Sequence, residues 1–194
     1  MPPGGPPAAL PPYDAVILAG GLARRLGGVD KPGLLVGERP LIARVAAAVA
    51  GAGRLVVAGP WRPGLAAAEF VREDPPGSGP VPALRAALPR VSAEWVALLA
   101  ADLPYVTAAH VDRLRAAAQD APGALYVDAG GREQWLAGVW RTAPLRAALE
   151  AYDGRSLHGL LAPLEPRRLT SPGDPGPWAD CDTPEDLAAA RERA

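Results

Sequence analysis

Residues Val16–Leu34 read VILAGGLARRLGGVDKPGL, and this stretch decides how the rest of the chain is interpreted. An apolar run from Asp14 to Ala19 stops abruptly at two glycines. More glycines and three cationic side chains follow before apolar residues resume. A short run that is apolar throughout is typical of a strand covered on both faces, as in a parallel sheet. We therefore expect a buried strand that leads directly into a glycine-rich loop.

The composition of this loop fits a cradle for a polyphosphate. Ligands of open α/β sheets bind beyond the carboxyl ends of the strands, and glycine lets backbone amides approach a ligand closely. Successive amides form an anion-binding nest, to which Arg24, Arg25 and Lys31 add positive charge. The loop is neither a P-loop, because Pro32 follows Lys31, nor a G-x-G-x-x-G dinucleotide fingerprint. An ordinary surface loop with solvated arginines remains the alternative.

Further apolar runs alternate with helical segments along the first 120 residues. This alternation predicts a doubly wound, mostly parallel α/β sheet. The expected strands after the first are 54–58, 69–72 and 95–101, and the expected helices are 40–53, 79–88 and 107–119 with Thr107 as N-cap. In the second half we expect strands at 123–131 and 134–141 around a Gly-Gly turn, a strand at 167–170, and helices at 142–151, 156–161 and after Thr183.

Asp102 comes directly after the apolar run WVALLAA. A carboxylate at that end of a parallel sheet lies opposite the glycine-rich loop, where it can hold Mg²⁺ against substrate phosphates. A turn or N-cap aspartate is equally compatible with the position. The residue types alone leave both interpretations open.

Bulk composition excludes some classes of protein. The 20 basic and 21 acidic residues nearly cancel, which argues against a nucleic-acid partner. No stretch has the length of a membrane span, and the start lacks the features of a signal peptide. A single cysteine, Cys181, favours a reducing compartment, so we expect a cytoplasmic protein. We interpret residues 1–12 as a disordered Pro-rich tail and 13–194 as one domain.

At this point the sequence resembles a known family. LAGGLARRLGGVDKP is similar to the opening motif of molybdenum cofactor guanylyltransferases, the MobA family of nucleotidyltransferases. VREDPPGSGPVPALRAAL, ALLAADLPYVT and WADCDTPEDLAAA resemble three further family segments and occur in the family's order. The resemblance implies a fold of the nucleotide-diphospho-sugar transferase type, a Rossmann-like sheet in three α/β/α layers. It further implies a nucleotide half near 13–120 and a smaller acceptor half near 121–194. It also implies GTP and molybdopterin as substrates, Mg²⁺ as cofactor, and transient contact with proteins that handle the molybdenum cofactor.

The resemblance also assigns roles to residues. Lys31, Arg25 and Asp102 are the expected catalytic residues, and Asp102 is the expected metal ligand, with Asp182 as a second candidate. The expected nucleotide-binding residues are Leu18, Ala19, Gly20, Gly21, Lys31, Asp74 and Asp102. On the acceptor side the candidates are Arg132, Arg155 and Asp180, followed by Arg141, His158, Trp135 and Trp140.

Two departures from the family pattern affect these expectations. Ala58 stands where relatives can place an asparagine near the base, and Asp180 and Asp182 replace the two asparagines of the family's N-x-N segment. Related cytidylyltransferases for the same cofactor read L-A-A-G, whereas Gly20 and Gly21 follow Ala19 in this sequence, which favours guanine as the base. The alternatives are a sister enzyme that uses CTP with the same pterin or GTP with 2-phospholactate, and an inactive nucleotide-binding module.

Overall fold

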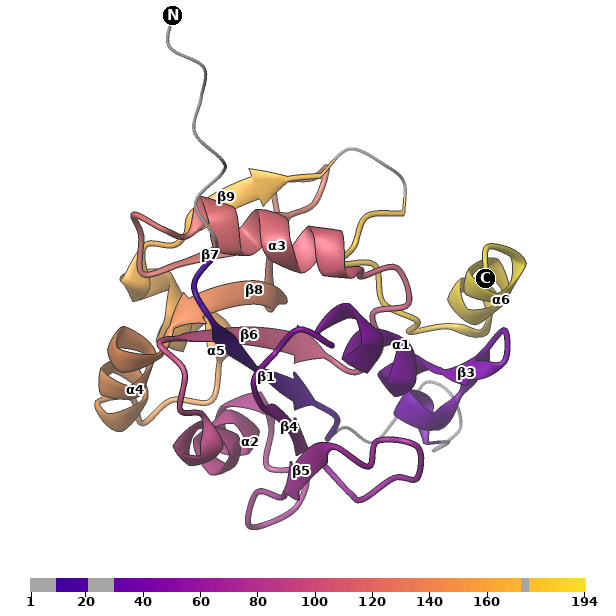
Figure 1. Cartoon of the computed structure of the whole chain (residues 1–194), viewed down its shortest axis with the longest axis horizontal. Coiled ribbons are helices and arrows are strands. Elements are labelled where there is room, and N and C mark those ends of the chain that lie inside the picture. The colour runs from indigo at the N-terminus through magenta and orange to yellow at the C-terminus, as the bar shows by residue number, and fades with distance from the viewer. Residues whose placement is uncertain (1–9, 21–29, 172–174) are drawn as a thin grey trace, which may run out of the picture.

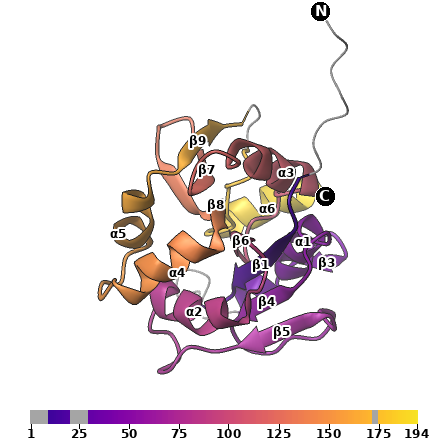
Figure 2. The same ribbon diagram turned by 60° about the vertical axis from the view of Figure 1, so that its left-hand side comes forward.

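The computed structural model describes residues 10–20, 30–171 and 175–194. Gly21, Arg24 and Arg25 therefore lie outside the described residues, as does most of the Pro-rich stretch. At the end of that stretch the Pro11 carbonyl accepts a hydrogen bond from Arg115 Nη2 at 2.5 Å. The described chain is built around one seven-stranded sheet in the order β5-β4-β1-β6-β8-β7-β9, with β5 and β9 at its two edges (Figures 1 and 2).

Every expected strand of the sheet is present, within a few residues of its predicted bounds. The strands are β1 Tyr13–Leu18, β4 Leu55–Ala58, β5 Ala68–Val71, β6 Trp95–Ala100, β7 Gly123–Val127, β8 Glu133–Arg141 and β9 Arg167–Thr170. Each pairs in parallel with its neighbours except β8, which runs antiparallel to both β6 and β7. The mostly parallel Rossmann-like sheet is thus confirmed. All six residues of β1 are buried, as the unbroken apolar run predicts.

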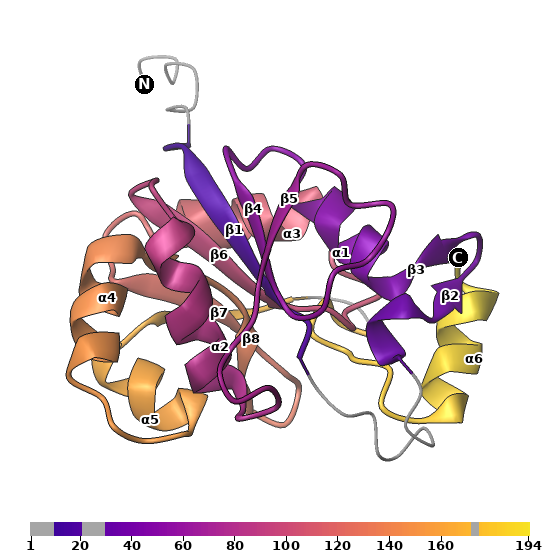
Figure 3. The same ribbon diagram turned by 90° about the horizontal axis from the view of Figure 1, so that it is seen from below.

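Helices cover both faces of the sheet. They are α1 Leu41–Ala48, α2 Pro80–Ala87, α3 Ala108–Ala117, α4 Thr142–Glu150, α5 Leu157–Leu161 and α6 Pro184–Glu192, with short 3₁₀ turns at η2 Lys31–Gly33, η3 Leu88–Arg90 and η4 Ala162–Leu164. Alternate residues of β1 divide between two cores: Ile17 packs with α1 and α3, and Val16 packs with α2, α4 and α5. Figure 3 shows these helices on opposite sides of the sheet, which confirms three layers.

A third, smaller cluster lies beside the sheet. It joins α6 to a short hairpin of β2 Leu35–Val36 and β3 Arg39–Pro40, and buries Val36, Cys181 and Leu187 (Figure 3). The hairpin was not expected, and Pro40 belongs to it: α1 begins at Leu41, so Pro40 precedes the helix instead of forming its first turn. Thr107 and Thr183 are the N-caps of α3 and α6, as predicted. No helix in the described part of the chain is long and apolar enough to cross a membrane.

Candidate active site

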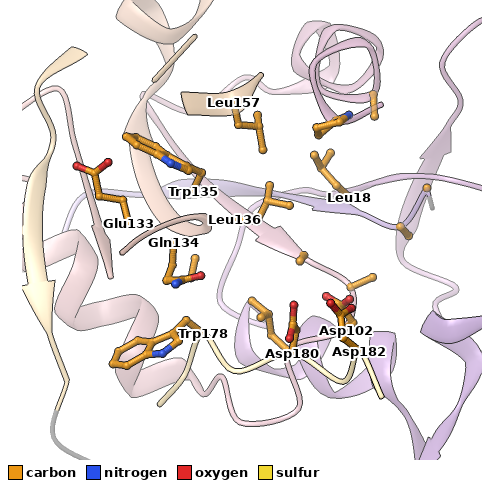
Figure 4. Close-up of a pocket in the computed structure, with 18 of the residues that line it drawn as sticks. Leu18, Asp102, Glu133, Gln134, Trp135, Leu136, Leu157, Trp178, Asp180 and Asp182 are labelled. Carbon is orange, nitrogen blue, oxygen red and sulfur yellow. The ribbon is translucent and has the colours of Figure 1, made fainter. Parts of the chain in front are cut away.

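A pocket of about 900 Å³ opens beyond the C-terminal ends of β1 and β6 and continues along β8 to α5. Most of the residues singled out in the sequence line this one space (Figure 4). They are Leu18, Ala19, Gly20, Lys31, Asp102, Arg132, Arg155, Asp180 and Asp182, together with Trp135 and His158. The fold therefore brings together the expected nucleotide residues and the expected acceptor residues in a continuous cavity.

Lys31 lies at the centre of the charged part of this pocket. Its ammonium group forms ion pairs with Asp102 and with Asp182, whose Oδ1 lies 2.6 Å from Nζ. Its side chain is only 11% exposed. Burial alone would lower the pKa of Lys31, but the two carboxylates outweigh burial and raise that pKa above its ordinary value. Lys31 is therefore a fixed positive charge at neutral pH. It is also the only lysine in the sequence, since the other 19 basic residues are arginines.

Three carboxylates gather around this ammonium group. Asp102 follows β6, whereas Asp180 and Asp182 come from the segment before α6, and one oxygen from each lies within 4.8 Å of the others. Burial, and then the charges of Asp182 and Asp102, raise the pKa of Asp180. Three hard oxygen ligands that repel one another are the donor set that suits Mg²⁺. The residues present thus fit the expected metal, with Asp180 as a further candidate ligand.

The segment that carries two of these acids is placed by the residues around it. Cys181, between them, is fully buried against Val36 and Leu187 in the third cluster, while its two neighbours line the pocket. Burial, above all, raises the pKa of the Cys181 thiol to about 11, so it is protonated at neutral pH. Immediately afterwards Thr183 caps α6: its backbone N–H donates to Asp186 Oδ2 at 2.8 Å, and Asp186 N–H donates to Thr183 Oγ1 at 3.2 Å.

The glycine end of the pocket is formed by the close approach of two strands. Ala19 N–H donates to the Ala58 carbonyl at 2.8 Å, and a Cβ on Gly59 would lie 2.9 Å from the Ala19 carbonyl oxygen. Ala58 is fully buried. Glu73 is a buried carboxylate next to Gly20, since a Cβ on Gly20 would lie 3.2 Å from its Oε1. The sequence alone does not single out Glu73 as a site residue.

Glu73 has one satisfied oxygen and one orphaned oxygen. Oε1 accepts a hydrogen bond from Gly77 N–H at 2.8 Å, whereas the buried Oε2 has no partner among the described residues. Neither Glu73 nor Asp74, the expected nucleotide contact, is among the residues that line the pocket, and Asp74 is exposed. A carboxylate that precedes a Pro-Pro-Gly turn at the end of a strand is the signal that points to either residue. The sequence does not say which of the two adjacent acids is turned inward.

The acceptor end of the pocket owes its lining to an irregularity in β8. Leu125 of β7 pairs with Gly138, but the next residue, Tyr126, pairs with Gln134, so residues 135–137 bulge out of the β7 ladder. Bulges of this kind redirect side chains and are common beside active sites. Here consecutive residues from Glu133 to Ala137 all line the pocket.

Aromatic side chains lie on two sides of this end. Trp135 packs edge-to-face on His158 with ring centroids 5.5 Å apart, and Trp178 lies across the pocket from it with Gln134 between them (Figure 4). Trp178 was not anticipated, and its place directly before the WADCD acids is the only signal for it.

Two of the weaker acceptor candidates lie elsewhere. Trp140 is fully buried in the core, because the regular part of β8 points its side chain against α4 and α5. Arg141, at the far end of the same strand, pairs with Glu94 at 2.5 Å and stacks over Trp95. Neither residue lines the pocket, so the structure does not support the expectation that they contact an acceptor there.

The sheet, the glycine turn and the opposed lysine and acids together define a phosphate-handling α/β protein. A family model, the MobA-like NTP transferase domain, matches residues 15–169. The chain is 34% identical to a molybdenum cofactor guanylyltransferase of Rhodobacter capsulatus, over 92% of this chain and 94% of the relative. It is 32% identical to one of Nitrobacter hamburgensis, over 95% and 96%.

Solved structures support the fold independently. The molybdopterin-guanine dinucleotide biosynthesis protein A of Archaeoglobus fulgidus matches with a TM-score of 0.73 at 18% identity, over 93% of this chain and 97% of that one. A 2-C-methyl-D-erythritol 4-phosphate cytidylyltransferase of Thermus thermophilus matches with a TM-score of 0.70 at 21% identity, over 94% and 98%. This protein belongs to the MobA-like NTP transferase family.

Proposed function

We propose that the protein transfers GMP from GTP to the terminal phosphate of molybdopterin and releases pyrophosphate. The observation that carries this proposal is the position of Lys31, Asp102 and Asp182 where the nucleotide end of the pocket meets its acceptor end. The relatives named above are guanylyltransferases and align over nearly the whole chain. A cytoplasmic location is proposed with it, on the basis of the single buried thiol.

The reaction makes one bond and breaks one. An oxygen of the acceptor phosphate attacks the α-phosphorus of GTP, and the bond between that phosphorus and the bridging oxygen breaks as pyrophosphate leaves. The attacking oxygen is already anionic, so no general base is needed. The difficulty is the approach of two anions and the charge that develops on the leaving group. Fixed positive charge and accurate positioning are therefore the main sources of rate.

The described residues divide this task. Leu18, Ala19 and Gly20 would bind the nucleoside through backbone groups, and Lys31 would leave its carboxylates to neutralise the triphosphate. Arg132 and Arg155 would hold the acceptor phosphate, and Trp135 and Trp178 offer flat faces for its ring system. Arg25 and Gly21, outside the described residues, remain proposed contacts.

Mg²⁺ is the proposed cofactor. Asp102 would hold it together with Asp182, and the Asp180 carboxylate is close enough to contribute. When bound, the ion would supply positive charge to phosphate oxygens, as divalent ions do in phosphoryl transfer. Because Lys31 pairs with Asp102 and Asp182, a bound ion would compete with its ammonium group for these two carboxylates.

The proposal is tested by pyrophosphate release with each of GTP, CTP and ATP, offered with molybdopterin or with 2-phospholactate. We expect turnover with GTP and molybdopterin, and an Asp102→Asn variant that loses roughly 100-fold or more in kcat, the scale of one preorganised charged contact. The control is Asp112→Asn, the same change on the exposed side of α3. Preference for CTP would indicate a molybdopterin cytidylyltransferase instead, and preference for 2-phospholactate would indicate a 2-phospholactate guanylyltransferase. Near-normal turnover by Asp102→Asn would refute the role of that residue.

A further inference from the structure

Arg62 is a buried cation that the reaction described above does not use. It lies in the loop between β4 and β5, and its side chain is only 9% exposed. Its Nε donates to Asp30 Oδ2 at 3.1 Å, and its Nη2 pairs with Asp30 Oδ1, which makes a two-pronged contact with one carboxylate. Its Nη1 donates to the Pro60 carbonyl at 3.1 Å. Because all three of its nitrogens are hydrogen-bonded, the guanidinium group holds the Asp30 carboxylate in a fixed position relative to the β4–β5 loop.

Arg62 binds Asp30, the residue at the start of the turn that carries Lys31. Asp30 immediately precedes Lys31, and Gly33 N–H donates to the Asp30 carbonyl at 3.0 Å. The Asp30 carboxylate folds back over this turn so closely that a Cβ on Gly33 would lie 2.6 Å from Oδ2. The next residue, Pro32, is buried. The turn η2 is therefore attached to the β4–β5 loop through Asp30, while the Lys31 side chain extends to the carboxylates after β6 and before α6.

We infer that Arg62 is a positioning residue for Lys31 and acts through Asp30. The inference rests on the proposed function, in which Lys31 must meet a triphosphate. A lysine side chain has four flexible bonds, so its ammonium group is placed accurately only when its backbone is fixed. The contacts of Arg62 fix that backbone from a neighbouring strand connection, without any contact between Arg62 and Lys31 itself.

Kinetics of four variants test the inference: Arg62→Met, Arg62→Lys, Asp30→Asn and the double variant Arg62→Met with Asp30→Asn. We expect each single variant to lower kcat roughly 10- to 100-fold with a much smaller change in KM for GTP, as a small misplacement of a catalytic group does. The double variant should be no worse than the poorer single variant, because both changes break one contact. Additive losses, or full kcat in every variant that folds, would overturn the inference.

Stability is separated from positioning by a matched control. Arg146 also donates to backbone carbonyls of another segment, Val91 at 2.5 Å and Leu88 at 3.3 Å, and it does not line the active-site pocket. Arg146→Met should lower the midpoint of thermal unfolding while the folded protein keeps its kcat. If Arg62→Met behaves in the same way, the role of Arg62 is structural only. Should Arg62→Met fail to fold, Arg62→Lys and Asp30→Asn carry the test, since Asp30 is 57% exposed.

A second readout does not depend on turnover. Because Lys31 is the only lysine, acetylation by acetic anhydride, followed by peptide mass spectrometry, reports one ε-amine. In the wild type the ion pairs with Asp102 and Asp182 should make this amine slow to react. Arg62→Met and Asp30→Asn should raise the rate several-fold, whereas Arg146→Met should not. Unchanged acetylation in the first two variants would overturn the inference even if the wild type proved to use another nucleotide.

Discussion

At the scale of single residues, the basic side chains divide unevenly between two types. The chain uses arginine 19 times and lysine once, and the one lysine is the residue that three acids surround. A guanidinium group is planar and wide and donates in a fixed fork, whereas an ammonium group is a compact point charge. The compact group lies between Asp102 and Asp182 and can turn from them to a phosphate without displacing either side chain. The identity of this residue, and not merely its charge, should therefore matter.

Lys31→Arg should lower kcat by roughly 100-fold or more although the charge is kept, because the fork cannot occupy the same position. The midpoint of thermal unfolding should change little, since arginine can still pair with the aspartates. Steady-state kinetics and calorimetry of the purified variant measure the two effects. Turnover within a few-fold of the wild type would show that charge alone suffices.

The position of Glu73 suggests a hypothesis about which nucleotide base the protein prefers. Its carboxylate lies next to Gly20, which lines the end of the pocket proposed to hold the base, although Glu73 itself is not among the lining residues. One of its two oxygens has no partner among the described residues. A carboxylate accepts from both N1–H and the N2 amino group of guanine, whereas a glutamine amide matches N1–H and the O2 of xanthine.

Glu73→Gln should therefore shift preference from GTP toward XTP, with a change in the ratio of kcat/KM of roughly 10-fold or more. Glu69→Gln, the same change at an exposed site on β5, is the control. The measurement is the pair of kcat/KM values for each protein. An unchanged ratio would exclude Glu73 from base recognition.

Asp180 makes stability depend on pH. Its pKa is raised in the folded protein, so folding disfavours its charged form. The stability linked to Asp180 is therefore fully present below its ordinary pKa and is lost as the pH rises through the raised value. Asp180→Asn should unfold at a higher temperature than the wild type at pH 7, by no more than about 2–4 °C for so exposed a group.

That gain should disappear near pH 3, where the wild-type carboxyl is also protonated. Thermal unfolding in EDTA between pH 3 and 7 measures it, because a chelator removes any divalent ion that would offset the repulsion. A gain that is independent of pH would point to a cause other than charge.

At the scale of secondary structure, β1, β4 and β6 could be predicted because their runs are almost continuously apolar and glycine or aspartate follows within two residues. Lys31 and Asp102 could be predicted to meet, because both follow strands whose carboxyl ends share one edge of the sheet. The β2–β3 hairpin could not, since two-residue strands have no periodicity to detect. Trp178 and Gln134 could not either, because their positions depend on the bulge in β8 and on the return of the chain to the pocket.

The N-terminus of α6 supplies an element-scale prediction. Thr183 caps this helix directly after Asp182, so the cap also fixes an acid of the pocket. Thr183→Ala should lower the free energy of unfolding by about 1 kcal/mol and should lower turnover several-fold. Thr107→Ala, at the cap of α3, should cost similar stability and leave turnover unchanged. Equal turnover in the two variants would show that the Thr183 cap does not affect the position of Asp182 in the site.

At the scale of the whole molecule, one sheet runs through both halves of the expected division. β6, from the nucleotide half, pairs along its length with β8, from the acceptor half. The two substrates would therefore meet across continuous hydrogen-bonded strands and not across a hinge. The sheet is not interrupted at the expected boundary near residue 120.

The last strand of the sheet ends at Thr170, yet the pocket takes Trp178, Asp180 and Asp182 from beyond it. A ribosome makes a chain from its N-terminus onward, so every strand emerges before these three side chains do. A nascent protein can thus assemble its scaffold while it still lacks the acids that oppose Lys31. The ability to catalyse the reaction would then arise late in biosynthesis, after the sheet has formed.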